Sequence, residues 1–124
     1  MERDPSLDAL LNLHGQVYVI DDASGVWVGF VVRRVAATVD RPHGLDYSLT
    51  MHRRDGERLV GFDNAHPVRS SAGPGGRTGG RDHKHRLKTV RLYEYRDAAS
   101  LLADFWDEVF SVCREMGKIG RAHV

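Results

Sequence analysis

The residues best suited to chemistry lie in one short segment, Asp82-His83-Lys84-His85. In an extended backbone, residues two positions apart point to the same side, so His83 and His85 would share a face. Two neighbouring imidazoles can serve as base and acid near pH 7, because a histidine ordinarily titrates at about 6.5. With a nearby carboxylate they can instead bind a divalent metal ion. A polar edge strand without a chemical role is the competing interpretation, because His-x-His alone is a weak motif.

A second polar group ends the preceding apolar segment, at Asp63-Asn64-Ala65-His66. Asp and Asn are common at strand ends because their side chains bond nearby backbone groups. The functional alternative is that Asp63 and His66 meet the histidine pair at one end of a sheet. Asp63 or Asp82 would then orient an imidazole, as a carboxylate orients the histidine of a catalytic triad.

The cations beside these histidines belong to a basic middle section of the chain. Residues 41–91 carry 11 basic and 5 acidic side chains, whereas both flanking sections are acidic overall. This asymmetry favours a polyanion such as nucleic acid as the partner, although a solvated Arg-rich surface would have the same composition. We predict that Arg81, Lys84 and Arg86 bind phosphate and stabilise the negative charge of a phosphoryl transition state.

The connection between the two polar groups is rich in glycine. Residues 70–81 contain five glycines and one proline, which predicts a flexible loop over about 67–81. The loop lacks the Gly-x-x-x-x-Gly-Lys-Ser/Thr order of a nucleotide-binding P-loop. Its arginines could contact phosphates and become ordered on binding.

Strands must position these groups, and the chain offers about five. Leu45–His52 alternates apolar and polar residues without a break, which predicts a strand with one dry face. Asp55-Gly56 follows it and is typical of a tight hairpin turn. The five predicted strands cover 16–20, 26–35, 45–52, 58–64 and 90–95.

Two helices flank the strands. A stripe of apolar residues at helical spacing predicts a C-terminal helix over roughly 98–116. Asp97 is its expected N-cap and Gly117 its expected end, which leaves 118–124 as a loose tail. A short N-terminal helix is predicted over 6–13.

These elements predict an α+β fold in which a meander-like antiparallel sheet is packed by the C-terminal helix. The 124 residues are enough for one domain with one core. We expect Trp27, Tyr47, Phe105 and Trp106 in that core. Tyr93 and Tyr95 suit either packing or stacking on unpaired bases.

Composition excludes several classes of protein. No apolar run approaches the 18 residues of a membrane span, and the first residues lack the apolar stretch of a signal peptide. Cys113 is the single cysteine, which excludes an internal disulfide and a cysteine-rich zinc cluster. A cytoplasmic location is therefore expected.

In combination, these residues resemble the TumE family of bacterial toxin–antitoxin proteins. The resemblance lies in three motifs and covers residues 45–112, with the strand Leu45–Met51 also similar. The motifs are Arg58-Leu59-Val60-Gly61-Phe62-Asp63-Asn64, then Asp82-His83-x-His85, then Leu101-Leu102-Ala103-Asp104-Phe105-Trp106. The chain departs from the family pattern in its longer loop between Asn64 and Asp82, where the resemblance implies a tighter link.

The resemblance implies a small cytoplasmic toxin of a type II system, neutralised by a co-encoded helix-turn-helix antitoxin, with RNA as the suspected target. Carried over residue by residue, it marks Asp63, Asn64, Asp82, His83 and His85 as site residues.

The leading hypothesis is therefore a metal-free endoribonuclease without a cofactor, in which His83 and His85 are acid and base. A non-catalytic binder of nucleic acid or protein is the first alternative. A metal-dependent nuclease or nucleotidyl enzyme that uses Asp63 and both histidines is the second. The N-terminal leucines predict a surface for the antitoxin or for a homodimer; they are Leu7, Leu10, Leu11 and Leu13.

Overall fold

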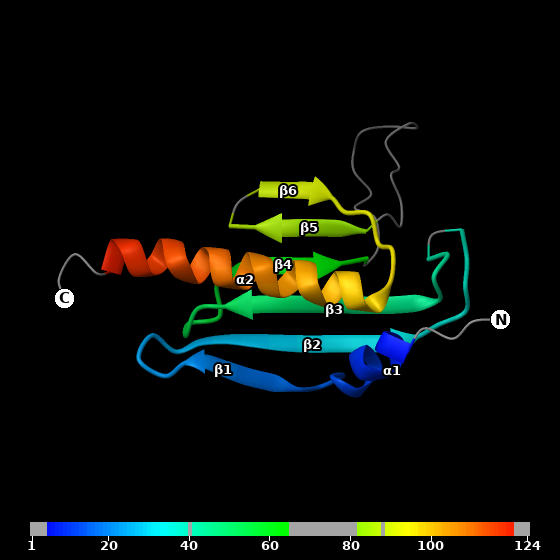
Figure 1. Ribbon diagram of the computed structural model, residues 1–124, viewed down its shortest axis with the longest axis horizontal. Coiled ribbons are helices and arrows are strands. Elements are labelled where there is room, and N and C mark those ends of the chain that lie inside the picture. The colour runs from blue at the N-terminus through cyan, green and yellow to red at the C-terminus, as the bar shows by residue number, and fades with distance from the viewer. Residues whose placement is uncertain (1–4, 40, 65–81, 88, 121–124) are drawn as a thin grey trace.

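The computed structural model describes residues 5–39, 41–64, 82–87 and 89–120. Its elements in chain order are α1 (Pro5–Asn12), β1 (Val17–Asp21), β2 (Val26–Arg34), β3 (Leu45–His52), β4 (Arg58–Asp63), β5 (His83–Arg86), β6 (Thr89–Leu92) and α2 (Ala98–Gly120). The strands form one antiparallel sheet in the order β1-β2-β3-β4-β5-β6, so each strand pairs with its neighbour in the sequence (Figure 1). The predicted α+β meander is confirmed.

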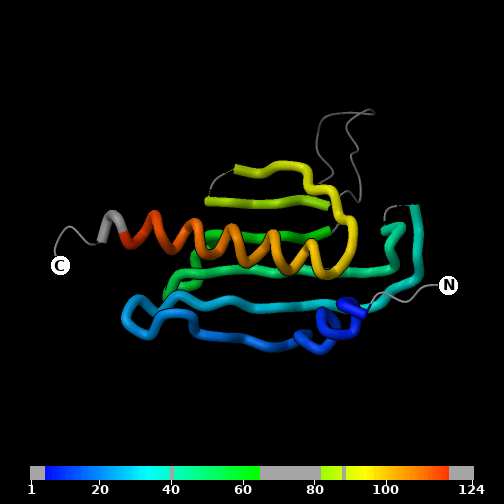
Figure 2. Tube along the Cα trace, in the orientation of Figure 1, coloured from blue at the N-terminus to red at the C-terminus, as the bar shows by residue number. Residues whose placement is uncertain are grey.

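One face of the sheet is covered by α2, which runs along the strands over β3 and β4, while α1 lies at one end of β2 (Figures 1 and 2). Phe105 of α2 is fully buried and makes edge-on ring contacts with Phe30 of β2 and Phe62 of β4. Alternation along β3 turns Leu45, Tyr47, Leu49 and Met51 into the same core. We call this side of the sheet the covered face.

The helix boundaries follow from backbone chemistry. Asp97 caps α2 as predicted, because its carboxylate accepts a hydrogen bond from the Ser100 N–H at 2.7 Å. The helix does not end at Gly117, and the predicted loose tail from 118 is wrong as far as Gly120. A glycine ends a helix when it turns to a positive φ, and Gly117 is not one of the glycines that do so.

The strands differ from prediction in number, because the segment around the two histidines forms β5. Together with β6, it makes a hairpin that adds two strands after β4, so the sheet has six strands rather than about five. The predicted strand over 90–95 is only Thr89–Leu92. The expected glycine-rich loop over 67–81 lies outside the described residues.

No helix in the described part of the chain lies on the opposite side of the sheet, which we call the open face. Its residues alternate with the buried ones: Val17, Val19, Trp27, Gly29, Val31, Arg33, Asp46, Ser48, Thr50, His52, Arg58, Gly61, Asp63, His83, His85, Val90 and Leu92. Placing Trp27 in the core was wrong, because it pairs with His52 on this open face. Tyr47 and Phe105 are buried as expected, and Trp106 is partly buried.

The N-terminal leucines serve the fold. Leu10 is completely buried, and the other three pack against the core. The proposal that these side chains form a partner surface therefore loses its main support. No helix in the described part of the chain is long and apolar enough to cross a membrane.

Candidate active site

Strand β5 divides the predicted catalytic segment between the two faces of the sheet. In the register, His83 lies opposite Asp63 and His85 opposite Gly61, which puts both imidazoles on the open face. Lys84 and Arg86 point to the covered face, toward α2. The period of two that brings the histidines together also separates them from these two cations.

His85 is held on both sides of its ring. Its Nε2 lies 3.2 Å from Asp63 Oδ2, and its Nδ1 lies 3.2 Å from an Arg58 guanidinium nitrogen. Because a guanidinium can only donate, Nδ1 must accept that hydrogen bond, and the ring proton must sit on Nε2. The Nε2–H then donates to Asp63. This arrangement fixes one neutral tautomer of His85, with its basic lone pair covered by Arg58.

Gly61 makes room for this contact. A Cβ at Gly61 would lie 3.1 Å from Arg58 Cδ and 3.5 Å from its Nε, so the Arg58 side chain lies down over the glycine. A register shift between Met51 and His52 puts Arg58 on the open face, and consecutive Leu59 and Val60 are both buried. Sequence patterns did not mark Arg58 as a site residue, because the register shift that turns it to the open face has no local signal in the sequence.

The electrostatics of the site favour a neutral His85 at physiological pH. Burial lowers the pKa of His85 below its ordinary value, and the positive charge of Arg58 lowers it further. Asp63 opposes both effects but does not outweigh them. The ring of His83 lies 6.4 Å from that of His85 between centroids. The arrangement can therefore supply a neutral base, an orienting carboxylate, a second imidazole and a cation on one surface.

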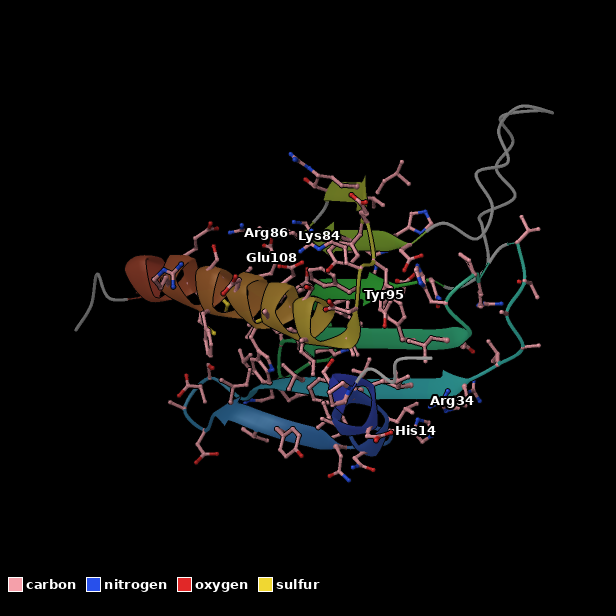
Figure 3. The ribbon with its side chains drawn as sticks, turned by 45° about the vertical axis from the view of Figure 1, so that its right-hand side comes forward. His14, Arg34, Lys84, Arg86, Tyr95 and Glu108 are labelled. Atoms are coloured by element: carbon pink, nitrogen blue, oxygen red, sulfur yellow. The ribbon has the colours of Figure 1, made fainter. Side chains whose placement is uncertain are left out.

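Lys84 and Arg86 form a separate charged cluster against α2. Lys84 Nζ lies 2.9 Å from Glu108 Oε2, and Arg86 pairs with both Glu108 and Glu115. Figure 3 shows Lys84, Arg86 and Glu108 side by side between β5 and α2. With Arg91 they line a hollow of about 390 Å³. The structure does not bring the predicted phosphate-binding cations Lys84 and Arg86 to the histidines.

Asp82 turns away from the open face. Its carboxylate accepts a 2.6 Å hydrogen bond from the hydroxyl of Tyr47, whose ring is buried in the core. Burial raises the pKa of Asp82, and the Tyr47 hydrogen bond and the charge of His43 only partly oppose the shift. Burial also raises the pKa of Tyr47, with Asp82 adding to the effect. Of the two acids predicted to orient an imidazole, Asp63 is the one that contacts His85.

Asn64 braces the backbone at the end of β4. Its side chain accepts a hydrogen bond from Tyr47 N–H at 3.0 Å and donates one to Leu45 carbonyl at 2.7 Å. Only 3% of the residue is exposed, so its amide has no surface left for a ligand. The predicted binding residues His66 and Arg81 lie outside the described residues.

Tyr93 and Tyr95 serve packing. Tyr93 donates a 2.6 Å hydrogen bond to Asp104 of α2, and its ring meets Phe62 edge-on. Tyr95 lies between His43 and Tyr47, with ring centroids at 4.3 Å and 5.9 Å. In the described part of the chain, no group of three or more His, Cys, Asp or Glu side chains is placed to hold a metal ion.

The chain also matches a known protein family. The model of the Toxin TumE family matches residues 11–112, which is most of the chain and includes every element from β1 to β6. The chain belongs to the TumE toxin family. The match includes Arg58, Asp63, His83 and His85, and it spans the long connection between Asn64 and Asp82. No curated protein and no solved structure matches this TumE chain.

Proposed function

We propose that this TumE protein is a toxin that cleaves RNA on the open face of its sheet, without a metal ion. The observation that carries the proposal is the chain of contacts from Asp63 through His85 to Arg58, with His83 beside it. A carboxylate-oriented neutral imidazole is a suitable base for a ribose hydroxyl. An arginine at the same position suits a phosphate because its fork of donors matches the phosphate oxygens.

The reaction is a transesterification: phosphorus keeps its bond to the 3′-oxygen and passes from the 5′-oxygen of the next nucleotide to the neighbouring 2′-oxygen. Arg58 leaves His85 Nδ1 for a non-bridging phosphate oxygen, and Nδ1 becomes free to take the proton of the ribose 2′-hydroxyl. The 2′-oxygen attacks phosphorus, the bond to the 5′-oxygen breaks, and the imidazolium of His83 gives its proton to that leaving oxygen. The products are a 2′,3′-cyclic phosphate and a free 5′-hydroxyl, so atoms and charges balance.

Two alternatives have less support. A metal-dependent nuclease needs a carboxylate and both imidazoles turned toward one ion, whereas His85 Nε2 donates to Asp63 and its Nδ1 accepts from Arg58. A pure binder needs no fixed histidine tautomer, although it remains the outcome if RNA is retained without turnover.

The test is RNA turnover by the purified chain below stoichiometric amounts, with a chelator present. We expect multiple cleavages per molecule, products that end in a 2′,3′-cyclic phosphate, and a loss of about 10²–10⁴-fold in the His85→Ala protein. Products ending in a 3′-hydroxyl, or activity that needs added metal, would contradict the proposal.

The pH dependence gives a sharper test. His85 must be neutral to accept a proton, so cleavage rises as the pH increases through its pKa, which lies below the ordinary histidine value. Removing the charge of Arg58 removes one cause of that lowering. In the Arg58→Gln protein we therefore expect the acid limb of kcat/KM to move to higher pH, in addition to a lower rate. An unmoved acid limb would exclude His85 as the base.

The family also bears on partners. We propose that a co-encoded helix-turn-helix antitoxin binds this toxin, and a homodimer remains a second prediction. Co-purification of the chain with the product of the adjacent reading frame, followed by a mass measurement of the complex, tests both.

A further inference from the structure

An aromatic pair lies on the open face beside the candidate active site. The indole of Trp27 and the imidazole of His52 are stacked, with centroids 4.2 Å apart and an interplanar angle of 19°. Both residues are only partly buried, and neither belongs to the core cluster. His52 is fixed in orientation, because its Nδ1–H donates to the Gly56 carbonyl at 3.0 Å. The proposed cleavage uses neither ring.

On the open face, two planar side chains, those of Trp27 and Arg58, each lie against a glycine. A Cβ at Gly29 would lie 3.4 Å from Cζ3 of Trp27, so the indole lies over the backbone of β2. Arg58 covers Gly61 in the same way on β4. Thr50 stands between the two glycines in the register. The small residues Gly29, Thr50 and Gly61 therefore leave room near the backbone at the centre of the sheet, and planar side chains lie against the two glycines.

These planar groups form a row across four strands. Trp27 pairs with His52 and His52 with Arg58, while Arg58 reaches His85 on β5. Three strand spacings, about 14 Å, separate β2 from β5. The row begins with a rigid aromatic stack and ends at the imidazole whose lone pair Arg58 covers.

We propose that the Trp27–His52 pair is a base-binding subsite, which makes single-stranded RNA the substrate class of this toxin. The inference rests on the proposed RNA cleavage and specifies it. An unpaired base can stack on the indole while the RNA backbone crosses the open face over β3 and β4 and its phosphate meets Arg58. A duplex cannot use this surface because its bases are already stacked on one another.

Stacking also explains why aromatic rings lie on an open face. A base stacked on an aromatic side chain strengthens binding by about 5- to 100-fold, and it does so for every base because each has a flat π-face. The stack is preorganised by the His52 hydrogen bond, so little conformational freedom is lost when a base binds.

The test uses a single-stranded RNA whose riboses carry 2′-O-methyl groups, because it lacks the attacking hydroxyl and cannot be cleaved by the proposed route. Binding is followed by tryptophan fluorescence in a Trp106→Phe background, which leaves Trp27 as the only tryptophan. We expect quenching on binding and an affinity at least tenfold higher for the single strand than for the duplex of the same sequence.

Substitutions then locate the base. Trp27→Leu, followed by anisotropy of a labelled strand, is expected to weaken binding by about 5- to 100-fold. Trp27→Phe keeps a ring and should restore most of the affinity. Tyr18→Leu is the matched control, because Tyr18 is also an aromatic residue near the sheet edge, 45% exposed, but it contacts Phe30 on the covered face. Its affinity should not change.

Three results would overturn the inference: unchanged affinity in a folded Trp27→Leu protein, equal losses in Trp27→Leu and Tyr18→Leu, or duplex bound as tightly as single strand. The proposed cleavage can fail separately. Trp27-dependent binding of the single strand with no turnover of unmodified RNA keeps the subsite and removes the catalytic proposal. Turnover that is indifferent to Trp27 does the reverse.

Discussion

The two faces of the sheet use the same strands for different purposes. On the covered face, apolar side chains from β2, β3 and β4 pack under α2, and the charged residues of β5 pair with carboxylates of the helix. On the open face, the same strands carry a carboxylate, two imidazoles, a guanidinium and a stacked aromatic pair. The comparison teaches that the two-residue alternation of side chains along a strand puts the stabilising residues on one face and the candidate site residues on the other.

The division is sharpest in β5, where neighbours in sequence have unlike surroundings. Lys84 Nζ is 2.9 Å from Glu108, whereas His83 and His85 lie beside Asp63 on the other side. A cluster of basic residues in the sequence therefore does not become one basic surface. The face, and not the distance along the chain, decides which residues can act together.

The largest expected effect on stability comes from removing a buried ring from the core on the covered face. Phe105→Ala should lower the free energy of unfolding by about 3–5 kcal/mol, because it removes a fully buried ring that contacts Phe30, Phe62 and Trp106. Denaturant unfolding followed by circular dichroism measures the loss. His83→Ala, on the open face, is the comparison and should change stability by less than about 1 kcal/mol. Equal losses in the two proteins would erase the distinction between the faces.

A smaller loss is expected at Asn64, which holds the ends of β3 and β4 together. Asn64→Ala leaves Tyr47 N–H and the Leu45 carbonyl without their partner and should cost about 2–3 kcal/mol. Thermal unfolding measures the cost. If Asn64 instead bound substrate, the substituted protein would keep its stability and lose RNA affinity, which is the opposite of our expectation.

The smallest effect concerns the charge on Asp82, and it depends on pH. Because burial raises the pKa of Asp82, the folded state binds this proton more tightly than the unfolded chain does, and stability falls as the pH rises through the raised pKa. Asp82→Asn stays neutral and still accepts from the Tyr47 hydroxyl. It should therefore be more stable than the natural protein at pH 7 and equally stable near pH 3. Melting temperatures at both values check this, and a gain that is equal at the two would contradict the assignment.

Much of the fold could be predicted from the sequence, because alternation and capping are local. The period of two in Leu45–His52 predicted the dry face of β3, and Asp97 predicted the start of α2. The predicted end of α2 was wrong because Gly117 tolerates a helical backbone as readily as the positive φ that ends a helix. The strand β5 was foreseen only as an alternative, a polar edge strand, and was not counted among the five because its polar residues carry no apolar period.

The site was predictable in part for the same reason. Spacing alone put His83 and His85 on one face, and the end of β4 brought Asp63 to them. The role of Arg58 depends on a register shift and a glycine on the same strand, which no local pattern reveals. Trp27 was misplaced because an aromatic residue in a valine-rich strand looks the same on either face.

The most direct test of the account compares two pairs of substitutions in one strand. The His83→Ala/His85→Ala protein changes the open face. The Lys84→Ala/Arg86→Ala protein changes the covered face at the alternate positions of the same strand, β5. We predict that the first loses cleavage of single-stranded RNA and toxicity on induced expression while remaining folded. The second should keep both to within a fewfold. Full activity in the first protein, or an equal loss in the second at unchanged stability, would contradict the claim that the open face does the chemistry.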